Sequence, residues 1–178
     1  MRLFVALALP ESVRDSLAGL IVGLPGVRWV PPANYHLTLR FIGEVTPQQA
    51  EEVDLALAAI RARPFDLALA GLGVFERQGR VHSLHAVAER TPALQHLQAK
   101  VETAVQRAGL APERRRFAPH VTLARTDSAP PGKLAGFVQA HNLFRTGPAR
   151  MEHFVLFSSR LGKEMAVYTP EVEYALAA

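Results

Sequence analysis

The sequence of 178 residues contains no cysteine. This absence excludes disulfides, thiolate metal sites and a cysteine nucleophile, so packing alone must stabilise the fold. No apolar run is long enough to span a membrane or to export the chain, since the opening run, residues 3–10, is short. We therefore expect a cytoplasmic protein without a membrane partner.

Lysine is scarce, with 3 residues against 17 arginines. Residues 1–89 hold 8 basic and 9 acidic residues, a charge of −1, whereas residues 90–178 hold 12 basic and 7 acidic residues, a charge of +5. The second half favours an anionic partner. A face that binds long nucleic acids is normally much more basic, so charge alone is weak support for polyanion binding.

The length fits a single domain, residues 1–178, built from two lobes that share a core. Thr-Pro pairs at 46–47 and 91–92 are typical helix starts, with the threonine as N-cap and the proline in the first turn. Periodicity predicts an α+β fold with helices outside sheets. The predicted helices are 10–20, 46–60, 91–108 and 134–140, and the predicted strands are 2–8, 27–30, 35–42, 65–72, 81–88, 117–125, 149–158 and 165–176.

Two of these strands share the motif H-x-T-L, at His36 to Leu39 and at His120 to Leu123. Because side chains alternate along a strand, each histidine shares a polar face with the threonine two residues later. With 7 His and 8 Thr in 178 residues, chance supplies about 0.3 H-x-T triplets. The separation of 84 residues, about half the chain, indicates an internal duplication in which a pseudo-two-fold axis brings the polar faces together.

Two facing imidazoles suit phosphodiester hydrolysis, because one can accept a proton from water while the other donates one to the departing oxygen. Thr38 and Thr122 can donate hydrogen bonds to the non-bridging phosphate oxygens. This scheme requires no metal and no cofactor. The alternative for each histidine is a structural role, which chance repetition makes a weak explanation for the pair.

The chain resembles the two-histidine phosphoesterases, most closely the bacterial family of RNA 2′,3′-cyclic phosphodiesterases, also called 2′-5′ RNA ligases. The resemblance lies in RLFVALALP, VRWVPPANYHLTLRFIG, FAPHVTLAR and FVLFSS, with Tyr168 downstream, and it covers nearly the whole length. It implies a bilobal fold with two antiparallel sheets around a central cleft. It also implies opening of RNA 2′,3′-cyclic phosphate ends to 2′-phosphomonoesters, with reversible 2′-5′ ligation, and no obligate protein partner.

By resemblance, His36 and His120 are the acid and base, with His120 activating water and His36 protonating O3′. Thr38 and Thr122 bind the phosphate, together with Arg125. Strict alternation would place Arg125 on the opposite face from His120, so the strand must bend or end before it. Further candidates for lining the substrate are Trp29, Arg40, Phe41, Ser158 and Tyr168.

His82 and His85 depart from the family pattern, which commonly has a Trp or Tyr on this strand. Their odd separation would place them on opposite faces of a strand, so we predict no metal site there. The run from Arg114 to Arg116 is either a solvated loop or an attractor of the RNA backbone. The alternative functions are a non-catalytic nucleotide- or RNA-binding module of the same fold and an esterase for a small cyclic phosphate.

Overall fold

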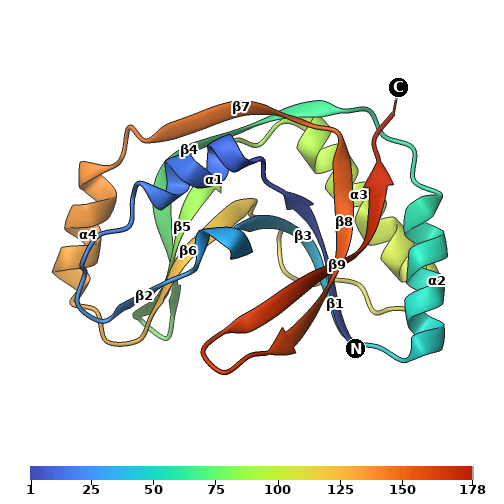
Figure 1. Cartoon of the computed structure of the whole chain (residues 1–178), viewed down its shortest axis with the longest axis horizontal. Coiled ribbons are helices and arrows are strands. Elements are labelled where there is room, and N and C mark those ends of the chain that lie inside the picture. The colour runs from blue at the N-terminus through green and yellow to red at the C-terminus, as the bar shows by residue number, and fades with distance from the viewer. Residues whose placement is uncertain (178) are drawn as a thin grey trace.

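A computed structural model of the chain, described for residues 1–177, forms one antiparallel sheet with helices on its outer sides (Figure 1). The capping box predicted at Thr46 is present, with reciprocal bonds between Thr46 and Gln49. The elements are β1 (Arg2–Ala8), α1 (Glu11–Ala18), β2 (Val27–Trp29), a 3-10 turn (Pro32–Asn34), β3 (His36–Glu44), α2 (Pro47–Ala58), β4 (Phe65–Arg77), β5 (Arg80–Ala88), α3 (Pro92–Arg107), β6 (His120–Thr126), α4 (Pro131–Ala140), β7 (Arg145–Met151), β8 (His153–Leu161) and β9 (Ala166–Ala175).

The strand order is β7-β4-β5-β6-β3-β1-β8-β9, with β2 pairing along β6. The two halves of this order are equivalent when the strands are counted outward from the β6–β3 junction. Strands β6, β5, β4 and β7 form one lobe, and β3, β1, β8 and β9 form the other. The sequence predicted two sheets, but a single pair, Leu37 with Val121, joins β3 to β6 and makes the sheet continuous. The lobes therefore meet at the centres of the two H-x-T-L motifs.

The register repeats in both lobes, as a duplication requires. Ala8 pairs with His36 in one lobe, and Val87 pairs with His120 in the other. Each pairing then skips one residue of the motif strand, Leu39 in β3 and Leu123 in β6. These skipped residues are β-bulges at the same position of each motif, and a bulge changes which residues face each side of the strand.

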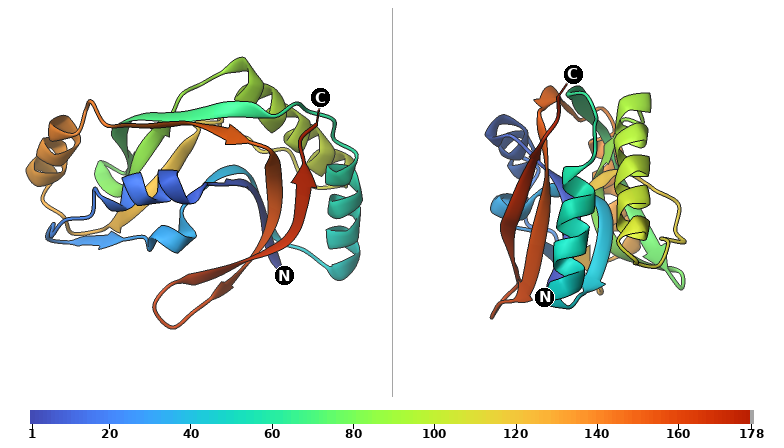
Figure 2. Two further views of the ribbon diagram at one scale, coloured as in Figure 1. Left: turned by 45° about the horizontal axis from the view of Figure 1, so that its top comes forward. Right: turned by 90° about the vertical axis from the view of Figure 1, so that its right-hand side faces the viewer.

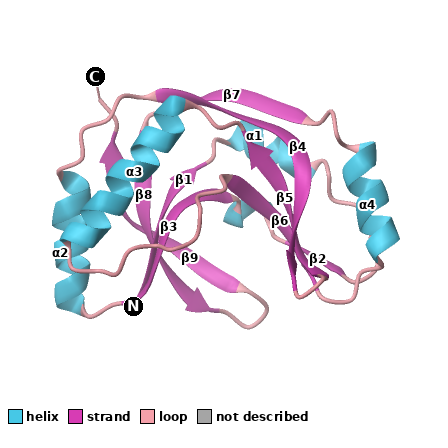
Figure 3. Cartoon of the chain, turned by 180° about the vertical axis from the view of Figure 1, so that it is seen from behind, coloured by secondary structure: helices cyan, strands magenta, loops and turns pink. Residues whose placement is uncertain are grey.

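The helices cover the lobes in a crossed arrangement. Helices α2 and α3 pack on each other, with α2 against β9 and α3 against β3 and also β4, whereas α1 and α4 contact β7 and β4 of the other lobe (Figures 1 and 3). Helix α1 follows β1 in the chain but packs on the opposite lobe. Figure 2 shows the sheet between α1 on one side and α3 on the other. Among residues 1–177, no helix is long and apolar enough to cross a membrane.

Several predicted elements differ from the structure. Strand β4 continues five residues beyond its predicted end at residue 72, to Arg77, and β6 begins at His120 instead of residue 117. The strand predicted for residues 149–158 is two strands, because β7 ends at Met151 on β4 while β8 pairs with β1. Only Glu152 separates the two strands, and residues 149–158 contain no glycine or proline to mark a turn, so the sequence pattern did not separate them. Helix α4 begins at Pro131, three residues before the predicted start, since proline is well tolerated in the first turn.

Candidate active site

The two histidines lie on the same side of the β3–β6 junction. Since Leu37 faces Val121 across antiparallel strands, His36 is opposite Thr122 and His120 is opposite Thr38. Leu37 and Val121 are fully buried, whereas their four polar neighbours are only partly buried. The histidine of each lobe therefore lies beside the threonine of the other lobe.

Both imidazoles are held by the same backbone contact. Nδ1 of His36 is 2.8 Å from the carbonyl oxygen of Asn34, and Nδ1 of His120 is 2.6 Å from that of Ala118. A carbonyl only accepts, so each Nδ1 carries the hydrogen. Each Nε2 is then the acceptor of the neutral ring and can take up or release a proton.

Burial lowers the pKa of His36 and of His120, and the positive charge of Arg125 lowers both further. The backbone hydrogen bonds oppose this effect in part. The pKa of His36 is also lowered by the charge on His120. Because repulsion between the two charged rings is mutual, it favours a pair that holds a single proton, and it leaves the acid and base roles expected from the sequence unchanged.

Aromatic rings surround His36. Its ring centroid lies 4.9 Å from Phe4, 6.3 Å from Phe157, and 5.2 Å from Tyr168, which meets it edge-on. The rings account for the burial that lowers the pKa of His36. The structure thus places Tyr168, a candidate from the sequence, directly beside His36.

The bulge at Leu123 returns Arg125 to the side of the histidines. After the skipped residue, Ala124 is buried and Arg125 is exposed, paired with Ser83 on β5 and with Arg28 on β2. Its charge acts on both histidines. Arg28 pairs with Asp127 at 3.1 Å, while Arg125 has no ion-pair partner within residues 1–177. Arg125 is therefore available to bind an anion. The bulge is the bend that the sequence analysis required before Arg125.

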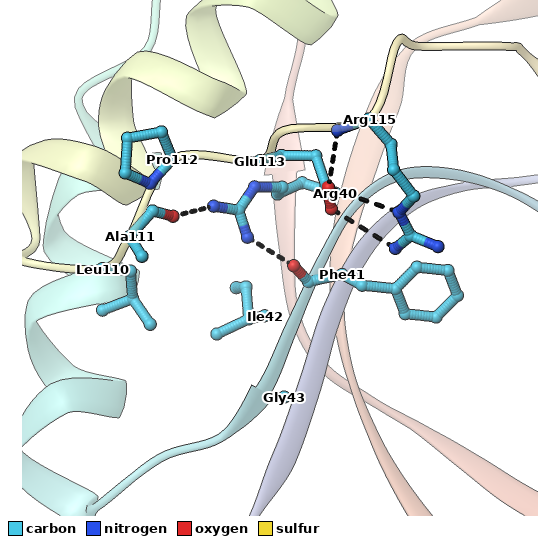
Figure 4. Close-up of a pocket in the computed structure, with 9 residues that line it drawn as sticks. All are labelled: Arg40, Phe41, Ile42, Gly43, Leu110, Ala111, Pro112, Glu113 and Arg115. Atoms are coloured by element: carbon cyan, nitrogen blue, oxygen red, sulfur yellow. Dashed lines mark hydrogen bonds and ion pairs between the residues drawn. The ribbon is translucent and has the colours of Figure 1, made fainter.

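The equivalent bulge at Leu39 directs Arg40 to the buried side of β3 and Phe41 to the histidine side. Arg40 is 7% exposed and donates to Glu102 and to the carbonyls of Ala111 and Phe41 (Figure 4). The expectation that Arg40 lines the substrate is wrong, because its guanidinium is engaged on the helix side of β3. Phe41, at 54% exposed, instead turns to the histidine side, 5.9 Å from Phe4.

Trp29 also faces away from the histidines. Its indole N–H donates to the carbonyl of Val22 at 2.8 Å, and its ring meets Phe137 of α4 at 5.9 Å. Trp29 pairs with Ala124 on the buried side of β6. The partly buried Trp29 therefore packs against α4 and the core, away from the histidine side of β6.

Ser158 lies on the other side of β8 from the rings around His36. It pairs with buried Leu3, and its hydroxyl donates to Glu171. Phe157, one residue earlier, contacts Phe4 on the histidine side. Ser158 is therefore also removed from the predicted lining.

Sequence reasoning left the roles of His85 and Phe75 unassigned, although both contact His120. The ring centroids of His85 and His120 are 5.1 Å apart, and Phe75 lies 4.7 Å from His120. His82 also lies beside Phe75, at 6.4 Å, so strand alternation did not separate the two histidines as expected. Within residues 1–177, no group of three His, Asp or Glu side chains is placed to hold a metal ion.

The arginine run lies in the loop that leads into β6. Arg115 pairs with Glu113 at 3.3 Å, and this pair borders a cavity of about 370 Å³ beside Phe41 and Arg40 (Figure 4). Arg114 and Arg116 are exposed. The loop is therefore close to Phe41, at the end of β3 beyond the histidine pair.

Comparison with known proteins supports the resemblance seen in the sequence. The family described as LigT like Phosphoesterase matches residues 7–83 and 86–168. An RNA 2′,3′-cyclic phosphodiesterase of Aeropyrum pernix is 40% identical over 66% of this chain and 65% of its own length, slightly under two thirds. One from Bacillus subtilis is 29% identical over 90% of this chain and 88% of its own.

A solved structure shares the whole architecture. The protein TT0787 of Thermus thermophilus superimposes with a TM-score of 0.80 at 29% sequence identity, covering 99% of this chain and 98% of that one. The doubled arrangement of strands and bulges is therefore built on a fold already known from crystals.

Proposed function

Because the chain belongs to the LigT-like phosphoesterase family, we propose that it hydrolyses RNA 2′,3′-cyclic phosphate ends to 2′-phosphomonoesters. The observation that carries this proposal is the histidine pair, in which both Nδ1 atoms are bound to carbonyls and both Nε2 atoms are left for proton transfer. Curated relatives named RNA 2′,3′-cyclic phosphodiesterase supply the substrate class. Because its proposed substrate is RNA, we propose that the protein acts in the cytoplasm.

The resemblance to the family supports a specific division of roles. The neutral His120 accepts a proton from the attacking water at Nε2, and the water oxygen forms the new bond to phosphorus. The bond from phosphorus to O3′ breaks, and Nε2–H of His36 supplies the proton to O3′. The protons balance, since one histidine gains what the other loses.

Thr38, Thr122 and Arg125 are suited to the charge on the phosphate. The hydroxyl of each threonine lies beside the imidazole of the opposite lobe, where it can donate to a non-bridging oxygen. Arg125 adds a positive charge close to both rings. Binding of the anion raises the pKa of each histidine, which favours the singly protonated pair that the reaction needs.

The same arrangement accounts for 2′-5′ ligation. If the 5′-hydroxyl of a second RNA takes the place of water, loss of its proton and attack on the cyclic phosphate give a 2′-5′ phosphodiester. The step is the reverse of 2′-5′ bond cleavage, so the two histidines exchange roles between the directions. Ligation therefore needs no residues beyond the hydrolytic set.

Single substitutions test the mechanism. We expect His36→Ala and His120→Ala each to lower kcat by about 10²- to 10⁴-fold on an RNA ending in a cyclic phosphate. Activity should survive EDTA, because neither proton transfer uses a metal. Persistence of full activity in both variants would remove the mechanism. Binding of a 2′-phosphorylated nucleotide without turnover by the unmodified protein would instead favour a non-catalytic module.

A change of leaving group tests the assignment of roles. In a nucleoside 2′-(4-nitrophenyl phosphate), nitrophenolate replaces O3′ and needs no proton to depart. The loss in His36→Ala should then largely disappear, while the loss in His120→Ala should remain. The opposite pattern would assign the base to His36.

A further inference from the structure

His85 lies on the histidine side of the sheet but is shielded from solvent. It pairs with Thr122 on β6 and with Gly73 on β4, and it is 7% exposed. It is therefore next to the phosphate-binding threonine along the strand ladder, yet too covered to meet a substrate itself.

The contacts of His85 are mainly with aromatic rings. Its ring stacks on Phe75 with centroids 4.2 Å apart and planes 26° apart. Both rings then meet His120 at steep angles, Phe75 at 4.7 Å and 78°, and His85 at 5.1 Å and 61°. The ring of His120 thus rests against a stacked pair, an arrangement that aromatic rings prefer.

The other lobe supports His36 in the same way but from different positions. Phe4 stacks on Phe157 at 5.1 Å and lies 4.9 Å from His36. Phe157 and Phe75 occupy equivalent places in the duplicated register, but Phe4 is equivalent to Ser83 and His85 is equivalent to Ala6. At these two positions each lobe therefore has one aromatic ring and one small residue. The ring comes first in one lobe, as Phe4 before Ala6, and second in the other, as His85 after Ser83.

Stability does not explain an imidazole at this position. Within residues 1–177, Nδ1 of His85 is buried without a hydrogen-bond partner, which disfavours folding. Burial and the nearby His120 lower the pKa of His85 to about 4, so its ring is uncharged at neutral pH. The space for the ring exists because residue 73 is glycine: a Cβ there would lie 2.7 Å from Nε2 of His85.

We propose that His85 is a positioning residue which, stacked on Phe75, holds the ring of His120 with Nε2 directed at the scissile phosphate. The inference rests on the proposed function for its kinetic consequence, but the geometry of His120 is measurable without any substrate. It is the shape of the ring at residue 85, acting through His120, that contributes to catalysis.

Removal and replacement of the ring test this role. His85→Ala should lower kcat about 10- to 100-fold with little change in KM, because His120 is misplaced after binding. Its second effect should be a rise in the pKa of His120, measured by NMR, because water replaces the ring. His85→Phe should restore kcat to within about threefold and restore the lowered pKa. A loss in His85→Phe equal to that in His85→Ala would overturn the proposal.

Gly73→Ala supplies a test from the other side of the ring. The new Cβ pushes His85 toward His120, so kcat should fall in the original background but not in the His85→Ala background. Additive losses in this double-mutant cycle would overturn the proposal. Leu84→Ala is the matched control: Leu84 is fully buried on the same strand facing the core, and its truncation should lower the melting temperature without moving the pKa of His120.

The outcomes separate this inference from the proposed function. If the unmodified protein does not turn over cyclic phosphates, the proposed function fails, and the NMR pKa of His120 in the variants still tests the positioning role. If turnover is present while kcat and the pKa of His120 are unchanged in His85→Ala, only the positioning role fails. Should His85→Ala not fold, His85→Phe and Gly73→Ala decide the matter.

Discussion

At the scale of single residues, the charge of Arg125 distinguishes this site from a pair of ordinary histidines. The guanidinium has no ion-pair partner within residues 1–177 and lowers the pKa of both His36 and His120. It can both attract a phosphate and keep the empty site from holding two protons. Lys at this position would retain the charge but lose the paired hydrogen bonds of the planar group.

Arg125→Ala should therefore raise the pKa of both histidines, since a nearby positive charge is removed. The acidic limb of the kcat/KM profile should move to higher pH, and kcat/KM should fall about 10- to 100-fold. A pH-rate series with Arg125→Lys as control checks this, as the lysine variant should keep the position of the limb. An unchanged limb in Arg125→Ala would mean that the charge does not act on the pair.

His85 links the site to the pH dependence of folding. Its pKa is about 4 in the folded chain and about 6.5 when unfolded, so the unfolded state binds the extra proton first. The contribution of the uncharged His85 to the free energy of unfolding is fully present above about pH 6.5 and is lost as the pH falls toward 4. Urea unfolding should show His85→Phe gaining about 3 kcal/mol on the unmodified protein as the pH falls over this range, because each pKa unit corresponds to about 1.4 kcal/mol. Parallel curves would contradict the assignment.

At the scale of elements, the Arg40–Glu102 ion pair holds β3 against α3 and the loop after it. Their side chains are 6% and 18% exposed, so the pair is largely desolvated. The bulge at Leu39 directs Arg40 to this side and leaves Phe41 on the other. The equivalent bulge at Leu123 directs Arg125 to the histidine side of β6. The same bulge position therefore places an arginine in a buried ion pair in one lobe and beside the histidines in the other.

Arg40→Ala should lower the free energy of unfolding by about 3 kcal/mol, because Glu102 is left without its partner. Arg40→Met should cost less, since it keeps the packing of the side-chain stem. KM for the RNA substrate should be unchanged in both variants. Denaturant unfolding, with kinetics measured well below the thermal midpoint, checks the two effects; a raised KM at full stability would return Arg40 to the substrate site.

At the scale of the whole molecule, the positive charge of the second half lies partly in the loop before β6. Arg114 and Arg116 are exposed there, next to the cavity that Phe41 borders. We infer that an RNA whose end lies at the histidine pair extends toward this loop, whereas a mononucleotide does not reach it. On this hypothesis the arginines distinguish substrates by length and not by chemistry.

We expect Arg114→Ser with Arg116→Ser to raise KM severalfold for an oligonucleotide with a cyclic phosphate end, and to leave KM for a mononucleotide unchanged. The effect should fade as salt is raised, since it is a phosphate contact. Arg63→Ser, in the exposed loop between α2 and β4, is the control. Equal effects on both substrates, or none on either, would assign the loop to solvent.

The sequence by itself determined the motif strands and the doubled plan of the molecule. Alternation placed each histidine with its threonine, and the separation of 84 residues predicted the repeat that the strand order shows. These features depend on local period, which any strand obeys whatever its neighbour.

Only the tertiary structure decided which other side chains join the histidines. Arg40 and Arg125 occupy nearly the same place in the two motifs, and the bulges together with the neighbouring elements send one to Glu102 and the other to the histidine side. A bulge is a property of pairing with a partner strand, so no period within one strand reveals it. His85 likewise gained its position beside His120 only when β5 paired with β6, from residues far apart in the chain.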